Sequence, residues 1–174
     1  MTRVAMMLAA LLMLPALSRG GPDEQWRTTA ASLKGIDGVY IVVRYDAPTE
    51  AQEGLSEQDL RSALALRLQA NDIRLLSEQE WARSPRRPYL CLTVTGTRLT
   101  DGIKDPDYLF AWGLDLIQRV STLEERTTEV PAITWTQEYS AVLPEHALRD
   151  VTVKVSDLAL EFATAVQAAE KGAK

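Results

Sequence analysis

The chain has 174 residues, a hydrophobic content of 46% and a formal net charge of −5. A mildly acidic chain lacks the basic excess that binding to a phosphate backbone requires, which argues against nucleic acid as a partner. The single cysteine, Cys91, excludes a disulfide within the chain, so stability has to come from packing.

The first 18 residues have the three parts of a secretory signal peptide. Arg3 precedes an uninterrupted apolar run over residues 4–14, and small residues follow at Ala16 and Ser18. A signal peptidase reads small side chains at these two positions, so the pattern predicts cleavage after Ser18, with Gly20 as the alternative. The mature chain would then have 156 residues and a net charge of −6.

Three other interpretations of this segment are weaker. Residues 4–17 fall short of the roughly twenty apolar residues that a membrane span needs. A lipid anchor would need a cysteine just after the apolar run, and Cys91 lies far downstream. A mitochondrial transit peptide would be amphipathic and rich in arginine and serine. We therefore expect a periplasmic or secreted protein without a transmembrane span or lipid anchor.

The first half of the mature chain alternates strands with helices. After a polar linker at residues 19–32, the β-branched and aromatic run at 39–45 predicts a buried strand. Ser56 and Asp59 form a capping-box pattern that begins a helix over residues 56–70. Residues 73–76 predict a short second strand, and a second capping box at Ser77 begins a short helix that ends in a basic, proline-containing loop.

The second half predicts three strands and a helix. Alternating apolar and polar residues indicate strands at 89–98, 108–120 and 132–141, which we expect to form an antiparallel meander. Pro144 suits the first turn of a last helix with an apolar stripe that runs to Val166. Residues 169–174 are expected to form a frayed tail.

This order of elements predicts an α+β fold in a single domain over residues 33–168. We expect a mixed five-stranded sheet, in the order β-α-β-α-β-β-β-α, with the helices packed on one face. The other face is rich in threonine and is expected to be exposed to water.

Few residues point to catalysis or metal binding. His146 is the only histidine, lies outside any known catalytic or zinc motif, and is interpreted as a surface residue. Asp101, Asp105 and Asp107 share a loop, but their spacing is not that of a calcium-binding loop. Cys91 lies on the threonine face of its strand, and partial burial is expected to keep it unreactive. If it were exposed, it could cross-link two chains. We therefore predict no enzyme activity, cofactor or metal.

Arginines offer the one candidate contact site. Arg83, Arg86 and Arg87 flank two prolines, and their guanidinium groups suit carboxylates or phosphates of an envelope polymer. A solvated loop is the alternative interpretation of these charges.

The remaining conspicuous side chains are interpreted as structural. Trp112 and Trp135 fall on apolar strand faces and are expected in the core. Asp115 and Glu138 lie on the polar face, where a flat sheet offers no cleft to tune a pair of carboxylates for glycosidase chemistry.

Four sequence segments carry a resemblance: GVYIVV, EGLSEQDL, IRLLSEQEW and PYLCLTVT. Their arrangement resembles a group of uncharacterised exported bacterial proteins, and the topology is similar to the amino-terminal domain of the Tol-system protein TolB and related envelope lipoprotein domains. The resemblance spans residues 33–166, without the β-propeller that follows in TolB. It implies a bacterial envelope setting and an interaction role, and it transfers no functional residue.

Our leading functional hypothesis is an exported, non-catalytic module that binds another cell-envelope component. The contact would involve the polar sheet face, an exposed edge strand or the arginine loop, with β-augmentation as the favoured mode. A small-ligand carrier or enzyme is the competing class and would need a pocket between sheet and helices. Self-association through the same edge is a third option.

Overall fold

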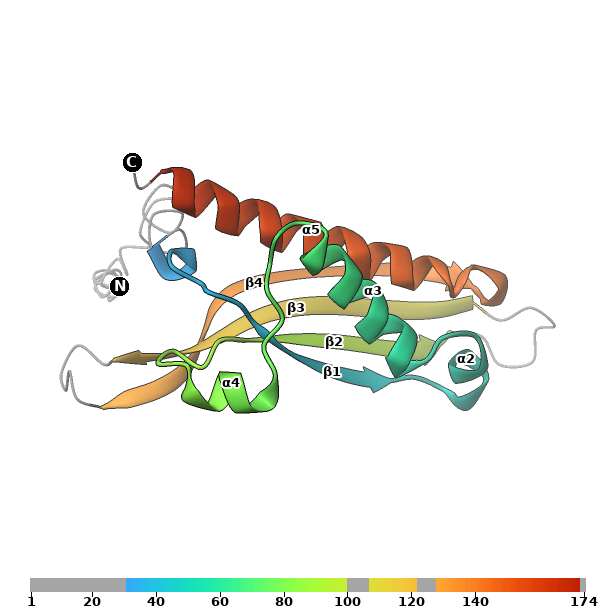
Figure 1. Cartoon of the computed structure of the whole chain (residues 1–174). Helices are drawn as coiled ribbons and strands as arrows, with labels where there is room; N and C mark the ends of the chain where they lie inside the picture. The colour runs from blue at the N-terminus through green and yellow to red at the C-terminus, as the bar shows by residue number, and fades with distance from the viewer. Residues whose placement is uncertain (1–30, 100–106, 122–127, 173–174) are drawn as a thin grey trace, which may run out of the picture.

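The computed structural model describes residues 31–99, 107–121 and 128–172 (Figure 1). In these ranges the chain forms an α+β fold in which helices pack on a mixed sheet. The elements in chain order are β1 (Tyr40–Asp46), α2 (Thr49–Gly54), α3 (Glu57–Gln69), α4 (Glu78–Arg83), β2 (Tyr89–Arg98), β3 (Asp107–Ser121), β4 (Glu129–Pro144), the 3-10 helix η1 (Glu145–Ala147) and α5 (Asp150–Lys171).

The sheet has the order β1-β2-β3-β4. Strands β1 and β2 are parallel, so the chain between them crosses over through α2, α3 and α4. The pairs β2–β3 and β3–β4 are antiparallel, which confirms the predicted meander. A register shift between Leu116 and Ile117 adds a bulge to the last pair.

The expected fifth strand at residues 73–76 is not present in the described sheet. Only Leu75 pairs there, through an isolated parallel bridge to Val39. The Val39 N–H donates to Arg74 O and the Leu76 N–H donates to Val39 O, both at 2.9 Å. The bridge ends because the next residue, Ser77, already caps α4. The described sheet therefore has four strands, not five.

One face of the sheet and two helices enclose the hydrophobic core. Figure 1 shows α3 and α5 lying over the same face of the sheet. Helix α3 contributes Leu60, Leu64 and Leu68, all fully buried, and α5 contributes an apolar stripe that includes Leu158 and Phe162. Arg67 Nε donates a 2.9 Å hydrogen bond to Ser156 Oγ and so links the two helices.

Helix α4 departs from the expectation that all helices pack on one face. Its Trp81 ring lies 5.7 Å from the Tyr40 ring and 6.1 Å from the Tyr89 ring. These two tyrosines are register neighbours, and strand alternation places them opposite the core-facing Ile41 and Leu90. The expectation is correct for α3 and α5 and wrong for α4, because a half-buried tryptophan holds that helix at one end of the opposite face.

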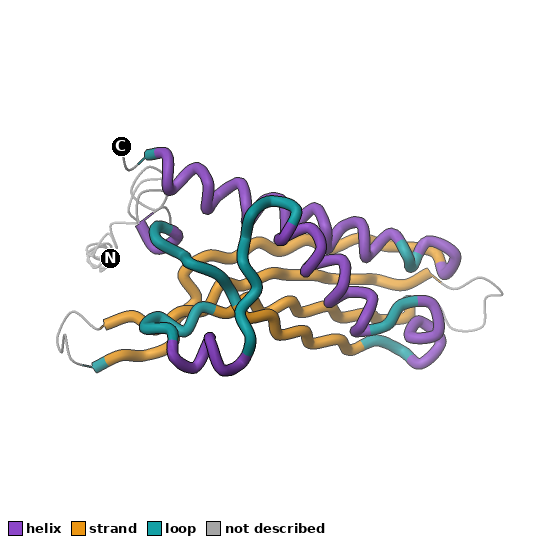
Figure 2. The backbone as a smooth tube through the Cα atoms, viewed as in Figure 1, coloured by secondary structure: helices purple, strands orange, loops and turns teal. Residues whose placement is uncertain are grey.

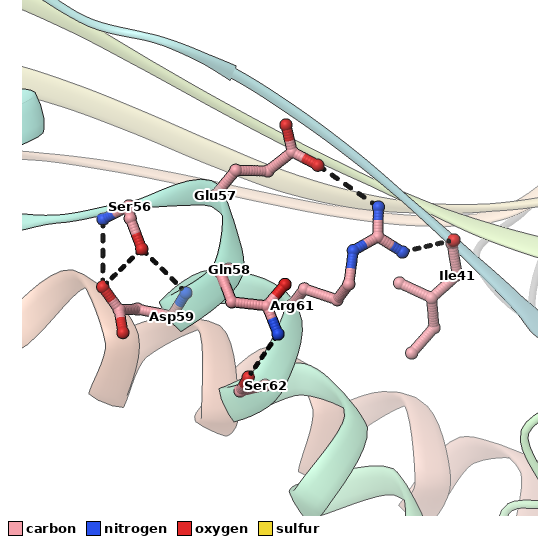
Figure 3. Close-up of polar contacts among 7 residues, drawn as sticks. All are labelled: Ile41, Ser56, Glu57, Gln58, Asp59, Arg61 and Ser62. Atoms are coloured by element: carbon pink, nitrogen blue, oxygen red, sulfur yellow. Dashed lines mark hydrogen bonds and ion pairs between the residues drawn. The ribbon is translucent and has the colours of Figure 1, made fainter.

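Both predicted capping boxes are present. At α3, the Asp59 N–H donates to Ser56 Oγ at 3.1 Å and the Ser56 N–H donates to Asp59 Oδ2 at 3.2 Å (Figure 3). Ser77 and Glu80 make the same reciprocal pair at α4. Each pair satisfies backbone donors that the first turn of a helix leaves open.

The last helix begins later than Pro144 predicts. After η1, α5 starts at Asp150 and continues to Lys171, so the expected tail at 169–174 begins inside this helix. Among the described helices, none is long and apolar enough to cross a membrane. The predicted signal peptide and most of the predicted linker lie outside the described residues.

Candidate functional site

The structure separates the three arginines of the predicted contact loop. Arg87 has a left-handed backbone with φ of 45°, and its guanidinium carbon lies 5.9 Å from the centre of the Trp81 ring. This distance allows a cation–π contact. The Trp81 Nε1–H donates to Arg87 O at 2.8 Å, so Arg87 belongs to the docking of α4.

Arg83 and Arg86 line a groove of about 380 Å³, which we name the arginine groove. The opposite wall is the segment that leads into β1. Figure 2 shows that this loop and the two loops flanking α4 gather at the same end of the sheet. The other lining residues are Gly35, Ile36, Asp37, Gly38, Arg74, Leu76, Glu80, Ser84, Pro85, Pro88 and Gln118.

Hydrogen bonds hold the two walls of the arginine groove together. Arg86 Nη1 donates to Lys34 O at 2.9 Å, and the Arg119 N–H donates to Arg86 O at 2.8 Å. Beneath them, the Gln118 side chain is 2% exposed, and its Nε2 donates to Ser32 O and to Thr134 Oγ1 at 3.0 and 2.8 Å. The groove is therefore a fixed feature of the fold.

Close packing at Gly38 also shapes the groove. A Cβ atom at this position would lie 2.7 Å from Arg74 O, a distance that real Cβ atoms essentially never show. Glycine thus allows the strand entry to approach the 73–76 segment and to form the Val39–Leu75 bridge.

Charges in the groove are unequally compensated. Arg74 forms an ion pair with Glu80, whose pKa is lowered chiefly by the hydrogen bonds from the Ser77 backbone N–H and hydroxyl, with Arg74 adding to the effect. Asp37 is the second acid in the lining. The Arg83 side chain is exposed and makes no hydrogen bond or ion pair with another described residue. Positive charge therefore prevails on the Arg83–Arg86 side.

A second concavity lies on the sheet face opposite the core. This threonine groove has a volume of about 580 Å³ and is lined by Thr93, Thr95, Ala111, Trp112, Gly113, Glu138, Tyr139 and Ser140. Register places Thr93, Gly113 and Glu138 in one row across three strands. A side chain at Gly113 would meet Glu138, with a Cβ 2.9 Å from its Cγ, so glycine creates the hollow.

The two edges of the sheet differ. The outer edge of β1 is partly covered, because the 73–76 segment bridges to Val39 and Arg61 Nη1 donates to Ile41 O at 3.0 Å (Figure 3). Glu57 holds the Arg61 guanidinium from the preceding turn of α3 at 3.3 Å. At β4, the Ser32 hydroxyl donates to Thr134 O, and no described strand pairs with the outer edge.

The positions of the histidine, of two tryptophans and of the cysteine considered in the sequence analysis are explained by exposure or packing. His146 is exposed in η1, as expected. Trp112 is buried in the core, whereas Trp135 is half-buried and its ring lies 5.2 Å from that of Phe162. Cys91 is 3% exposed, more fully buried than expected, so the condition for disulfide cross-linking between chains is not met.

Acidic residues do not gather in the part of the chain that the structure describes. Asp115 accepts a 2.6 Å hydrogen bond from Thr136 Oγ1, and Glu138 is exposed in the next row of the sheet. Asp101 and Asp105 lie outside the described residues, and Asp107 is exposed at the start of β3. Within the described ranges, no group of three potential metal ligands occurs.

The sequence did not reveal most of the arginine groove. Arg74, Gln118 and Gly38 come from three distant segments, and only the crossover and the meander together bring them to Arg83 and Arg86. The proline-flanked arginines were the one recognisable feature.

No protein-family model and no curated protein matches the chain. Among solved structures, a PelC dodecamer from Paraburkholderia phytofirmans is similar at 16% identity, with 70% of this chain and 85% of that chain covered and a TM-score of 0.44. A minor lipoprotein from Acinetobacter baumannii is similar at 14% identity, with coverages of 76% and 94% and a TM-score of 0.39. A hypothetical protein from Chlamydia trachomatis is similar at 10% identity, with coverages of 71% and 98% and a TM-score of 0.39.

These likenesses are too distant to carry an argument about function, and similarity to the TolB domain is not shown.

Proposed function

We propose that this protein is an exported, non-catalytic module that binds another cell-envelope component. An extended segment of that partner would pair with the outer edge of β4 as an added strand. The observation that carries the proposal is the difference between the two sheet edges. Arg61 and the 73–76 segment occupy outward-facing groups of β1, whereas most of β4 has no described strand beside it. An unpaired edge offers main-chain donors and acceptors to an incoming strand.

The side chains of β4 support this proposal. The strand runs for 16 residues, and Ile133 and Val142 are 59% and 54% exposed. An added strand would cover such apolar side chains at intervals along the edge and so gain specificity as well as main-chain hydrogen bonds. Tyr139 donates to Glu161 of α5 at 3.1 Å, which fixes the middle of β4 against the helix layer.

The competing carrier or enzyme would need room between sheet and helices. That layer is occupied by fully buried side chains from the sheet and from both covering helices, among them Leu92, Leu114, Leu64 and Leu158. The two grooves described above lie outside this layer. The interior thus supports a binding module with an external contact surface.

The envelope location in this proposal depends on residues 1–18, which carry the signal-peptide pattern. Amino-terminal sequencing of protein purified from the periplasm or medium is expected to begin at Arg19. Detection of only the full-length chain, retained inside the cell, would contradict export.

A photo-cross-linking residue at Val142 tests the β4 contact in intact cells. The matched control is Leu66 on α3, which at 68% exposed is at least as accessible as Val142 at 54%. We expect one reproducible polypeptide adduct from position 142 and none from position 66. The captured partner is then purified, and amide hydrogen exchange of this protein is measured with and without it.

Hydrogen exchange distinguishes strand addition from other contacts. Strand addition should slow exchange of alternate amides along β4, because only those facing outward gain a partner. The substitution Val142→Lys should weaken the complex, whereas Leu66→Lys should leave it intact. Protection that is confined to other elements would overturn the proposed mode. Protection that rises with the concentration of this chain alone would identify a second copy as the occupant.

A further inference from the structure

We propose that the arginine groove is a binding site for an oxyanion, a carboxylate or phosphate group, with Arg83 and Arg86 as its ligands. This inference goes beyond the β4 contact and does not depend on it, because the groove lies at a different place and uses different residues. The sequence singled out the arginines, and the structure supplies the concave site around two of them.

The two arginines differ in what holds them. Arg86 is fixed at both ends, by its Nη1 donation to Lys34 O and by the acceptance of the Arg119 N–H at its own carbonyl. One bond to Lys34 leaves most of the five guanidinium donors of Arg86 for a ligand. Arg83 ends α4, and its side chain makes no hydrogen bond or ion pair with another described residue. The pair therefore combines an anchored and an adaptable guanidinium.

The shape of the site favours a small ligand group. The groove holds about 380 Å³ and is closed below by the buried Gln118 and along one wall by Gly35 and Gly38. Gly35 and Gly38 have no side chains that would block a small anion from the guanidinium groups, and the Gly35 N–H already donates to Glu170 Oε1 at 2.6 Å, so the arginines supply the donors. Planar guanidinium forks match carboxylate and phosphate oxygens in geometry as well as charge.

The charges that face the groove set its selectivity. Glu80 is held in an ion pair by Arg74, and Asp37 lies on the opposite wall. These two carboxylates compensate two of the three arginines among the lining side chains, which leaves an excess of one positive charge there. A third carboxylate, Glu170, lies at the rim, where it accepts the Gly35 N–H at 2.6 Å. A compact anionic group fits this balance better than a polyanion, which these acids would repel.

Nuclear magnetic resonance of the folded chain tests the site. Inorganic phosphate and acetate are titrated separately at low and matched ionic strength, and shifts are followed at the amides of residues 35–38 and 83–88 and at the arginine Nε–H groups. We expect saturable shifts in these groups. The relative affinities for phosphate and acetate show which source of the oxyanion the site prefers.

Three variants separate specific binding from general charge effects. Arg83→Gln should weaken binding about tenfold, the usual effect of losing one charge-assisted hydrogen bond. Arg44→Gln removes another exposed positive charge, from β1, and should change affinity less than about twofold. Glu80→Gln keeps a side chain that can complete the capping box and releases Arg74, so it should strengthen binding.

Each outcome decides the inference. Loss in Arg83→Gln together with gain in Glu80→Gln supports the site, because misfolding cannot produce a gain. Equal loss in Arg83→Gln and Arg44→Gln would overturn it, as would shifts that do not saturate with either anion.

Discussion

Asp59 couples the start of α3 to pH. Its pKa is lowered mainly by the hydrogen bonds from the Ser56 hydroxyl and backbone N–H. A carboxyl whose pKa is lower in the folded state stabilises the fold fully above its ordinary value in the unfolded chain, about 4. That contribution is lost as pH falls through the lowered folded-state pKa.

We therefore predict that Asp59→Asn reduces the free energy of unfolding at pH 6 and has a diminishing effect below about pH 4. Urea denaturation of wild type and variant across this range measures the difference. Asp157→Asn, which removes an exposed carboxylate on α5, controls for the loss of one surface charge. A difference that stays constant down to pH 2 would show that the capping box does not depend on ionised Asp59.

Three neighbouring arginines illustrate how far one residue's role depends on its surroundings. In the sequence, Arg83, Arg86 and Arg87 are equivalent basic residues beside prolines. In the fold, Arg87 lies over Trp81 whereas the other two line the arginine groove. Local sequence predicted the charge of the site, but the positions of Arg74, Gln118 and Gly38 depend on contacts across the chain.

At the level of elements, α4 depends on a single side chain for its position. The helix has six residues and none of them is fully buried, so it has little stability of its own. Trp81 supplies ring contacts to Tyr40 and Tyr89 and a hydrogen bond to Arg87 O. The same helix carries Arg83, which makes the geometry of the arginine groove dependent on Trp81.

Trp81→Ala is expected to lower the free energy of unfolding by about 2 kcal/mol, below the usual cost for a fully buried tryptophan because this ring is half-buried. Amide exchange should accelerate over residues 77–88 more than over β3. Trp81→Phe keeps an aromatic ring and loses only the N–H donor, so it should restore most of the stability. An equal effect of both variants would assign the docking to the hydrogen bond rather than to the rings.

Strand and helix positions were predictable to the extent that they depend on local patterns. The alternation in residues 89–98 and the capping boxes at Ser56 and Ser77 predicted β2 and the starts of α3 and α4. The 73–76 run has the composition of a strand, yet pairing depends on a partner, and only Leu75 reaches Val39. The placement of α4 on the opposite face depends on contacts of Trp81 with Tyr40 and Tyr89. Tyr40 is distant in sequence from both of the other residues, so no local pattern predicts these contacts.

On the scale of the whole molecule, one hydrophobic core joins the sheet to the helices α3 and α5, and β4 contacts that core through the sheet face that α5 covers. Trp135 contacts Phe162 and Tyr139 contacts Glu161, so α5 holds the strand whose outer edge forms the proposed contact surface. The stability of the core and the integrity of that edge are therefore linked. Because α5 also packs on α3 and β3, its loss should unfold both layers together.

This link gives a prediction for a pair of α5 variants. Phe162 is fully buried, whereas Leu160 is 38% exposed on the same helix. Phe162→Ala should lower the free energy of unfolding by about 4 kcal/mol, because it leaves a cavity against Trp135. Leu160→Ala should change it by less than about 0.5 kcal/mol. Denaturant unfolding, followed by far-ultraviolet circular dichroism and by tryptophan fluorescence, measures both values.

Whether the circular dichroism and fluorescence transitions occur at the same denaturant concentration decides whether β4 and the core unfold as one cooperative unit. Circular dichroism reports the helices, and the fluorescence is measured in a Trp26→Phe, Trp81→Phe background, so that it reports Trp135 on β4 and Trp112 on β3. We expect both transitions to coincide in this background and to shift together when Phe162→Ala is added. A fluorescence transition that precedes the loss of helix would show that β4 detaches first. The proposed edge would then be an independently mobile strand, and partner binding would have to supply the free energy of ordering it.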